Sequence, residues 1–191
     1  MDKPIILSIL TPSIPERWQS LNNLTEQIQN QIGDDWPVEH LVFVDNRKRS
    51  IGRKRDGLLR LARGKYVAFV DDDDHVHANY TNEILHAAKE NPDVITFQQI
   101  ADVNGQKGTV EFRLGNPDES FKPGEITKRN AWHVCAWRTS LAIQSSFPNC
   151  NYGEDRAFSA PLCGLPGLKE IHIPKALHYY TYDSAVSRAE P

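Results

Sequence analysis

The sequence contains no uninterrupted apolar stretch that approaches the ~18 residues a transmembrane helix requires. Its first residues, Met1-Asp2-Lys3-Pro4, also lack the basic flank, apolar segment and small-residue cleavage site of a signal peptide. These two absences argue against a membrane-spanning or exported protein. They predict a cytoplasmic location.

Cysteine is scarce: the three present, Cys135, Cys150 and Cys163, are odd in number and have no CxxC spacing. That pattern argues against both a disulfide framework and a zinc site, so free thiols are expected. Internal repeats, low-complexity tracts and obvious linkers are absent as well. Because 191 residues suffice for one buried core and are few for two, we expect a single domain over residues 1–191.

The charges are unevenly distributed, although the formal net charge is only −3. One segment, here called the basic cluster, carries nine cations and a single acid, Asp56. Its cations are Arg47, Lys48, Arg49, Arg53, Lys54, Arg55, Arg60, Arg63 and Lys65. The basic cluster leads into four consecutive aspartates, Asp71 to Asp74, which predicts a place where a polyanion and a divalent cation meet.

Strands and helices are expected to alternate through the first hundred residues. Apolar runs predict buried strands at residues 5–10, 40–44, 66–70 and 93–97. Helical periodicity and end signals predict helices at residues 16–32, 51–63 and 78–90. This alternation indicates right-handed βαβ units and a mainly parallel sheet covered on both faces.

The second half is less regular, because glycine and proline interrupt short strand-like pieces such as residues 109–113. We expect hairpins and loops there, followed by helices near residues 138–145 and 154–163.

Polar residues follow three of the predicted strands, at Thr11-Pro12-Ser13, Asp45-Asn46 and Asp71 to Asp74. In an open parallel sheet these strand ends face one crevice, where ligands bind. Four adjacent carboxylates after a buried strand repel one another unless a cation neutralises them, and oxygen ligands suit Mg²⁺ or Mn²⁺. A solvated acidic turn is the alternative interpretation.

Two neighbouring segments resemble the nucleotide-sugar-binding core of the family-2 glycosyltransferases. They are Gly52-Arg53-Lys54-Arg55-Asp56-Gly57 and the stretch from Ala62-Arg63-Gly64 through the apolar strand to Asp71-Asp72-Asp73-Asp74. The family pattern is a basic helix with Arg usually followed by Asn, an Ala-x-Gly turn, an apolar strand and an Asp-x-Asp metal motif. Asp56 departs from it, standing where Asn is usual. The resemblance covers nearly the whole chain, which is similar also to the short transferases of phages and mobile elements.

The resemblance implies a GT-A (Rossmann-like) fold, a three-layer α/β sandwich with a mainly parallel central sheet. A nucleotide-sugar-binding half would occupy about residues 1–100 and an acceptor-binding half about residues 101–191. The expected donor is a nucleoside-diphosphate sugar, in the first place a UDP-sugar. The expected cofactor is Mn²⁺ or Mg²⁺.

Donor-side residues are carried over from the family pattern by position. Those expected at the nucleotide-sugar are Thr11, Pro12, Arg17, Asp45, Arg55, Asp71 and Asp72. Asp73 is expected to hold the metal that bridges the two phosphates, with Asp71 as a second ligand. A divalent ion there would neutralise charge that develops on the departing diphosphate.

The run Asn151-Tyr152-Gly153-Glu154-Asp155 resembles the family's Glu-Asp motif ahead of a short helix. The resemblance implies that Asp155 removes a proton from the acceptor hydroxyl, as in inverting members, with Glu154 on the acceptor side. Taken without the family, Gly-Glu-Asp is only a good helix start.

Two further segments have weaker matches. Residues 176–188 resemble the family's closing strand and the Ser-rich loop that folds over the donor, and His178 there is expected to complete the metal shell, with a structural histidine as the alternative. In residues 131–138, Trp132, His133 and Trp137 are expected on the acceptor side, where aromatic faces stack on a sugar ring or base. Core packing is the alternative for the tryptophans.

The leading hypothesis is therefore metal-assisted, inverting transfer of a sugar to an acceptor hydroxyl on a glycan, a protein or a modified nucleic acid. A nucleotidyltransferase is one alternative, although the sequence lacks a Gly-rich basic loop directly after the first strand. A non-catalytic nucleic-acid-binding module that uses the basic cluster is the other.

Overall fold

The computed structural model describes residues 3–33 and 36–184. Its strands are β1 (Leu7–Ser13), β2 (Val38–Val44), β3 (Tyr66–Phe69), β4 (His75–Val76), β5 (Val94–Val103), β6 (Gln106–Phe112), β7 (Ile126–Arg129), β8 (Ala136–Arg138) and β9 (Glu170–Tyr182). Its helices are η1 (Pro15–Arg17), α1 (Trp18–Gln29), α2 (Ile51–Leu61), α3 (Tyr80–Ala88), α4 (Thr139–Ala142) and α5 (Glu154–Cys163). Among these helices, none is long and apolar enough to cross a membrane.

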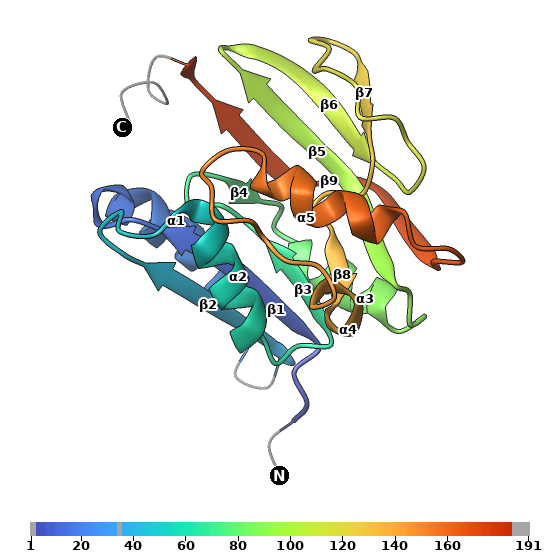
Figure 1. Cartoon of the computed structure of the whole chain (residues 1–191), viewed down its shortest axis with the longest axis horizontal. Coiled ribbons are helices and arrows are strands. Elements are labelled where there is room, and N and C mark those ends of the chain that lie inside the picture. Colours follow the sequence, from blue (N-terminus) through green and yellow to red (C-terminus); the bar gives the residue numbers. More distant parts are fainter. Residues whose placement is uncertain (1–2, 34–35, 185–191) are drawn as a thin grey trace.

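The strands of the described residues form one mixed sheet in the order β2-β1-β3-β8-β5-β6-β7, with β9 beside β5 and β4 beside β9 (Figure 1). The two longest ladders, β1 with β2 and β5 with β9, are parallel. β8 is antiparallel to both of its neighbours, β3 and β5, and so lies between two strands of the same direction. The predicted α/β class with a mostly parallel central sheet is confirmed.

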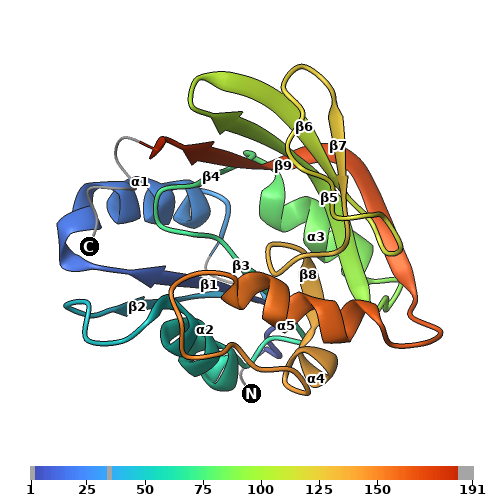
Figure 2. The same cartoon turned by 45° about the horizontal axis from the view of Figure 1, so that its top comes forward.

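Helices cover both faces of the sheet, as Figure 2 shows: α1 and α3 lie on one side, and α2, α4 and α5 on the other. Successive side chains of a strand point to opposite faces of the sheet, so neighbouring residues of one strand are buried in different core clusters. Leu7 and Ile9 of β1 pack in one core cluster with residues of α1 and α3. Leu10 packs in the second cluster with residues of α2 and α5. The three-layer sandwich therefore has two apolar interfaces, one on each face of the sheet.

The Ala-x-Gly turn before β3 has a steric reason. A Cβ on Gly64 would lie 2.6 Å from the backbone nitrogen of Ser8, a distance that side chains do not tolerate. Gly64 N also donates to Ser8 Oγ at 2.8 Å, and Thr139 Oγ1 donates to the Gly64 carbonyl at 2.6 Å. The glycine thus lets the turn pack against β1 and fixes the level at which β3 starts.

Several predicted boundaries are corrected. β1 continues to Ser13, because Thr11, Pro12 and Ser13, expected in a loop, pair with β2. The strand expected at residues 93–97 is twice as long and forms a hairpin with β6. The helix expected from residue 138 begins only after β8, a strand that the sequence interpretation missed. Of the closing segment expected at residues 176–188, the part beyond Ser184 lies outside the described residues.

Candidate active site

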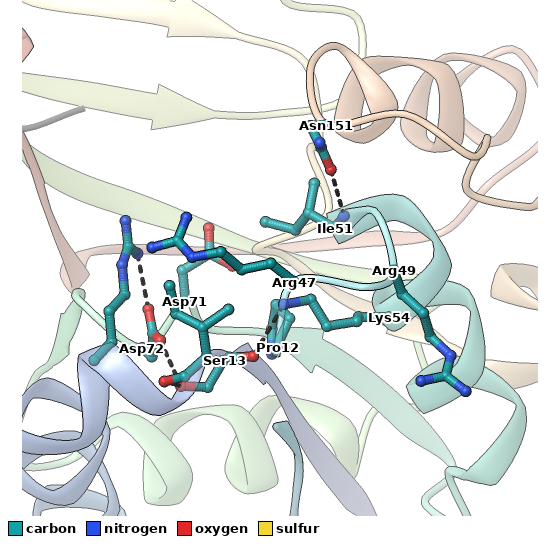
Figure 3. A pocket seen from close by; sticks show the side chains of 11 residues that line it. Pro12, Ser13, Arg47, Arg49, Ile51, Lys54, Asp71, Asp72 and Asn151 are labelled. Carbon is teal, nitrogen blue, oxygen red and sulfur yellow. Dashed lines mark hydrogen bonds and ion pairs between the residues drawn. The ribbon is translucent and has the colours of Figure 1, made fainter. Parts of the chain in front are cut away.

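A cavity of about 320 Å³ opens beyond the carboxyl ends of β1 and β3, next to the start of α2. Its lining residues are Pro12, Ser13, Ile14, Arg17, Arg47, Arg49, Ile51, Lys54, Asp71, Asp72 and Asn151. In Figure 3, Ser13, Asp71 and Asp72 lie on the sheet side, while Arg49 and Lys54 come from the segment that begins α2. The position agrees with the rule that open α/β sheets bind ligands beyond the ends of their strands.

The lining is rich in positive charge. Arg17, Arg47, Arg49 and Lys54 outnumber the two carboxylates of the lining, Asp71 and Asp72. Guanidinium groups bind phosphate oxygens through two parallel hydrogen bonds, and lysine binds them as a point charge. These four cations also form ion pairs, with Asp72, Asp73, Glu16 and Asp45, so a ligand with two or more negative charges, such as a diphosphate, would compete with these carboxylates for them. We call the cavity the cationic pocket.

Asp72 is fixed at the rim of the cationic pocket. Ser13 Oγ donates to its Oδ2 at 2.6 Å, and Arg17 Nη1 donates to its Oδ1 at 3.0 Å. The same Arg17 nitrogen reaches Asp73 Oδ2 at 2.8 Å. Asp72 and Arg17, both expected at the donor from the sequence, thus line the cationic pocket and form an ion pair with each other.

The four carboxylates carry more negative charge than their neighbours compensate. Although 44% of the Asp73 side chain is exposed, partial desolvation and the charge of Asp74 next to it raise its pKa to about 7. Burial likewise raises the pKa of Asp72 and of Asp74 above the ordinary range. Of the four, only Asp71 has a lowered pKa: burial acts to raise it, but the charges of Arg55, His133 and His178 and the hydrogen bonds from Arg55 together outweigh that effect. An added cation would relieve this repulsion.

Arg55 is the cation that stabilises Asp71. Its Nη2 donates to both carboxylate oxygens of Asp71 at 2.7 Å, and its Nη1 donates to Glu154 Oε1 at 2.6 Å. Only 3% of the Arg55 side chain is exposed, and it is not part of the cavity lining. The expectation that Arg55 contacts the nucleotide is therefore corrected: the guanidinium lies beneath the surface and joins the aspartate run to the start of α5.

Asp155 lies in the first turn of α5, directly after Glu154. Its Oδ1 accepts a hydrogen bond from the backbone nitrogen of Arg156 at 2.7 Å. Glu154 is buried against Arg55, whereas Asp155 is half-buried and has no ion pair among residues 3–33 and 36–184. A helix N-terminus favours an ionised carboxylate. The two neighbouring acids therefore differ in environment: Glu154 is buried and anchors the helix start, and Asp155 is more exposed.

His178 of β9 is buried beside the aspartate run. Its Nδ1 lies 3.1 Å from Gln99 Oε1, and its Nε2 lies 3.2 Å from Asp74 Oδ2. The buried Nε2 of His178 and the other carboxylate oxygen of Asp74, Oδ1, have no hydrogen-bond partner in the described chain. Across residues 3–33 and 36–184, no three or more His, Cys, Asp or Glu side chains are grouped so that together they could hold a metal ion.

The aromatic side chains of residues 131–138, a segment that ends in β8, lie in two different environments. Trp137 is completely buried in the core cluster that includes α5, so it cannot stack on an acceptor, and that expectation is corrected. His133 is 6% exposed, and burial, together with the charge of Arg55, lowers its pKa to about 3. Trp132 is half-buried, and its indole Nε1 donates to Asp118 Oδ1 at 2.9 Å.

Thr11 and Asp45, both expected at the nucleotide-sugar, have side chains that are buried in the protein. Thr11 is completely buried, and its Oγ1 donates to the Val70 carbonyl at 2.9 Å, so it supports the sheet instead of contacting a ligand. Asp45 has a side chain that is 7% exposed and lies 3.3 Å from Lys54 Nζ. Pro12 lines the cationic pocket as expected.

The basic cluster does not form one continuous surface. Arg47, Arg49 and Lys54 line the cationic pocket. Arg55 is internal, and others are paired outside the pocket: Arg60 with Asp56 and Arg63 with Glu39. The sequence interpretation did not assign the first three cations, or Asn151, to a donor pocket. The sequence did contain a signal for these three cations, because they follow the carboxyl end of β2. It contained none for Asn151, which comes from a loop 100 residues after Ile51.

Comparison with known proteins now identifies the family. Residues 20–147 match the family described as Glycosyl transferase family 2. The chain belongs to this family.

Individual relatives agree with that assignment. The chain is similar to a poly(ribitol-phosphate) beta-glucosyltransferase of Bacillus spizizenii (28% identity over 92 residues, 46% of this chain and 14% of that protein). It is also similar to the putative glycosyltransferase EpsH of Bacillus subtilis (26% identity over 105 residues, 50% of this chain and 30% of that protein). The chain therefore spans less than a third of the length of these curated relatives.

Solved structures confirm the GT-A fold. The S. aureus TarS 1-349 structure in complex with UDP-GlcNAc superimposes with a TM-score of 0.69 at 17% identity, over 94% of this chain and 59% of that one. The complex of the same protein with UDP gives a TM-score of 0.68 at 16% identity, over 94% of this chain and 61% of that one. At this identity the likeness concerns the fold.

Proposed function

We propose that this protein transfers a sugar from a nucleoside-diphosphate sugar, a UDP-sugar in the first place, to an acceptor hydroxyl with inversion at the anomeric carbon. The observation that carries the proposal is the cationic pocket beside the aspartate run in a family 2 fold. Arg17, Arg47 and Lys54 would bind the diphosphate there. The UDP-bound state of the TarS structures supports the choice of nucleotide.

The proposed reaction has one displacement step. The acceptor oxygen attacks the anomeric carbon and gives its proton to Asp155, while the bond from that carbon to the diphosphate oxygen breaks and its electron pair leaves with the UDP. Asp155 fits the role of base because it is half-buried and not engaged in an ion pair within the described residues. Glu154, held by Arg55, would fix the direction of the helix start that carries it.

We further propose that Asp71 and Asp73 hold Mn²⁺ or Mg²⁺. His178, expected as a further ligand, lies beside Asp74 and is not grouped with both of these aspartates in the described residues. The neighbours of Asp73 support this metal assignment, because the charges of Asp71, Asp72 and Asp74 add to desolvation in raising its pKa and a bound cation would offset them. Mg²⁺ in nucleotide enzymes is commonly held by one or two carboxylates together with substrate phosphates, so a complete protein cage is not required. When bound, such an ion would neutralise charge on the diphosphate.

The proposal is tested by measuring UDP release from several UDP-sugars, with and without Mn²⁺, and with a panel of hydroxyl acceptors. Asp155→Asn should bind UDP normally but lose roughly 10²–10⁴-fold in kcat, the usual contribution of a general base. Asp73→Asn should lose the response to Mn²⁺. Asp102→Asn on β5, outside the site, serves as the charge-matched control. Metal-independent turnover would overturn the metal assignment, and full activity of Asp155→Asn would overturn the base.

A rival function is binding of nucleic acid through the basic cluster. Its dispersion weakens that alternative, because the cations lie partly in the cationic pocket and partly in ion pairs elsewhere. The nucleotidyltransferase alternative is weakened by the family membership of the chain.

A further inference from the structure

An arginine outside the cationic pocket lining forms no ion pair with a carboxylate of residues 3–33 and 36–184. It is Arg129, the last residue of β7. Its guanidinium carbon Cζ lies 4.3 Å from the centre of the Trp132 ring, in cation–π contact. The indole is itself fixed by its hydrogen bond to Asp118. The guanidinium therefore rests on a rigid aromatic platform.

The charge of Arg129 is poorly compensated. Within residues 3–33 and 36–184 no carboxylate forms an ion pair with it, and its buried Nε has no hydrogen-bond partner. Burial lowers the pKa of Arg129, and the more distant charges of Asp118 and Asp155 offset this only in part. A half-buried arginine without a partner costs stability, which a bound anion would recover.

Arg129 and Asp155 border the same region. The segment that follows Arg129 contacts the last residue of α5, where Cys163 Sγ donates to the Ala131 carbonyl at 3.3 Å. It then reaches the end of β3, where the Phe69 nitrogen donates to the His133 carbonyl at 3.3 Å. The charge of Asp155 acts on both Arg129 and His133. An acceptor that offers a hydroxyl to Asp155 would thus have a cation within reach.

We propose that Arg129, stacked on Trp132, binds an oxyanion of the acceptor, so that the substrate of Asp155 is an anionic hydroxyl compound. This inference rests on the proposed glycosyl transfer. A phosphate and a carboxylate share the chemistry that a guanidinium recognises, since each offers two oxygens to its two nitrogens. The pair Arg129 and Trp132 would then select the acceptor, whereas Asp155 activates it.

Binding is tested with the intact chain by NMR, using the indole N–H resonance of Trp132, assigned with Trp132→Phe, as the reporter. Saturating UDP first occupies the cationic pocket, so that the probes cannot bind there. Methyl phosphate and potassium acetate are then titrated in separate arms, against NaCl at the same ionic strength. We expect at least one of the two anions to shift the resonance saturably, and the stronger arm identifies the class of oxyanion.

Three variants make the result specific. Arg129→Gln should weaken binding at least tenfold, and Arg129→Lys, which keeps the charge but loses the planar fork, should retain part of it. Lys128→Gln removes one charge from an exposed neighbour on the same strand and should bind like the wild type. No shift by either anion, or equal binding by wild type and Arg129→Gln, would overturn the inference and leave Arg129 a structural residue.

Donor hydrolysis, measured without an acceptor, tests the proposed function separately from the inference about the acceptor. If wild type and Lys128→Gln hydrolyse UDP-sugars but no anion reaches Trp132, the proposed function stands and the inference about the acceptor is wrong. If the anions bind but no UDP-sugar is turned over, the proposed function is wrong, and the interpretation of the anion as part of an acceptor is withdrawn with it.

Discussion

The guanidinium of Arg55 contacts Asp71 through one terminal nitrogen and Glu154 through the other, at 2.7 and 2.6 Å. These two carboxylates belong to motifs that are far apart in the sequence, one after β3 and one at the start of α5. Because 3% of the Arg55 side chain is exposed, water cannot replace the guanidinium if it is removed. A single buried cation therefore links the segment after β3 to the start of α5.

Arg55→Met should destabilise the protein by about 3–5 kcal/mol, because it leaves two carboxylates without their buried partner. The measurement is urea unfolding at pH 7.5. Arg53→Met, an exposed position two residues earlier on the same helix, should change the free energy of unfolding by no more than about 0.5 kcal/mol. Equal effects of the two substitutions would show that the bridge has no structural role.

His40 predicts a pH dependence of stability. Burial lowers its pKa from 6.5 to about 4, and its Nε2 lies 2.9 Å from Thr11 Oγ1. The unfolded chain takes up a proton at this residue below pH 6.5, whereas the folded chain does so only near pH 4. The associated stability is present above pH 6.5 and is lost as the pH falls towards 4, with a slope of about 1.4 kcal/mol per pH unit.

Urea unfolding of wild type and His40→Gln at pH 7.5, 6.0 and 5.0 checks this expectation. Glutamine can still bond to Thr11 but does not titrate, so the variant should lose less stability on acidification. His133, whose pKa is also lowered by burial, is present in both proteins and cancels in the difference. Parallel pH profiles would contradict the assignment to His40.

The start of α2 depends on a close approach to the loop before α5. A Cβ on Gly52 would lie 1.9 Å from the Pro148 carbonyl oxygen, while Gly52 N donates to the Cys150 carbonyl at 3.1 Å. The neighbouring Ile51 nitrogen donates to Asn151 Oδ1 at 2.9 Å. Ile51 and Asn151 both line the cationic pocket, so the packing of this helix end and the shape of the pocket are linked.

Gly52→Ala should therefore push the helix away from the loop, lower the stability and weaken UDP binding. Gly57→Ala on the same helix is the matched control: its Cβ would lie 3.4 Å from a Phe43 ring carbon, an ordinary contact. Alanine there should stabilise the helix by up to about 1 kcal/mol. Thermal unfolding and UDP titration of both variants give the comparison, and an undisturbed Gly52→Ala would contradict the packing argument.

Elements with a strong local pattern were predictable from the sequence. The helix expected at residues 154–163 coincides with α5, and the strand expected at residues 66–70 differs from β3 by one residue. β8 was not predictable, because its three residues form a strand only by pairing with β3 and β5. Within the site, the crevice followed from the strand ends, whereas the burial of Arg55 and Thr11 depends on long-range packing that residue types do not reveal.

In the whole molecule, the cationic pocket is lined by segments from both halves of the sequence. Pro12 and Asp71 come from the first half and Asn151 from the second. A ligand that fills the pocket would hold these segments together and stabilise the folded state. By mass action the gain is about 2.7 kcal/mol when the ligand concentration is 100 times its Kd.

UDP should therefore raise the melting temperature in a concentration-dependent manner, and less so at high salt, since exposed charges are screened. Arg47→Gln should weaken UDP binding about tenfold, in line with the loss of one charged hydrogen bond. Lys48→Gln, an exposed neighbour that is not in the pocket lining, should not weaken it. A melting temperature that does not respond to UDP would contradict the assignment of the cationic pocket.

The position of β8 between β3 and β5 has a consequence for how the protein is made. β5 leaves the ribosome about 35 residues before the strand that must separate it from β3, as the strand bounds show. A nascent chain that ends before Ala136 carries β3 and β5 with unpaired edges, which are templates for pairing with other chains. Completion of the central sheet thus waits for the second half of the sequence, and premature termination would yield an aggregation-prone fragment instead of a smaller folded protein.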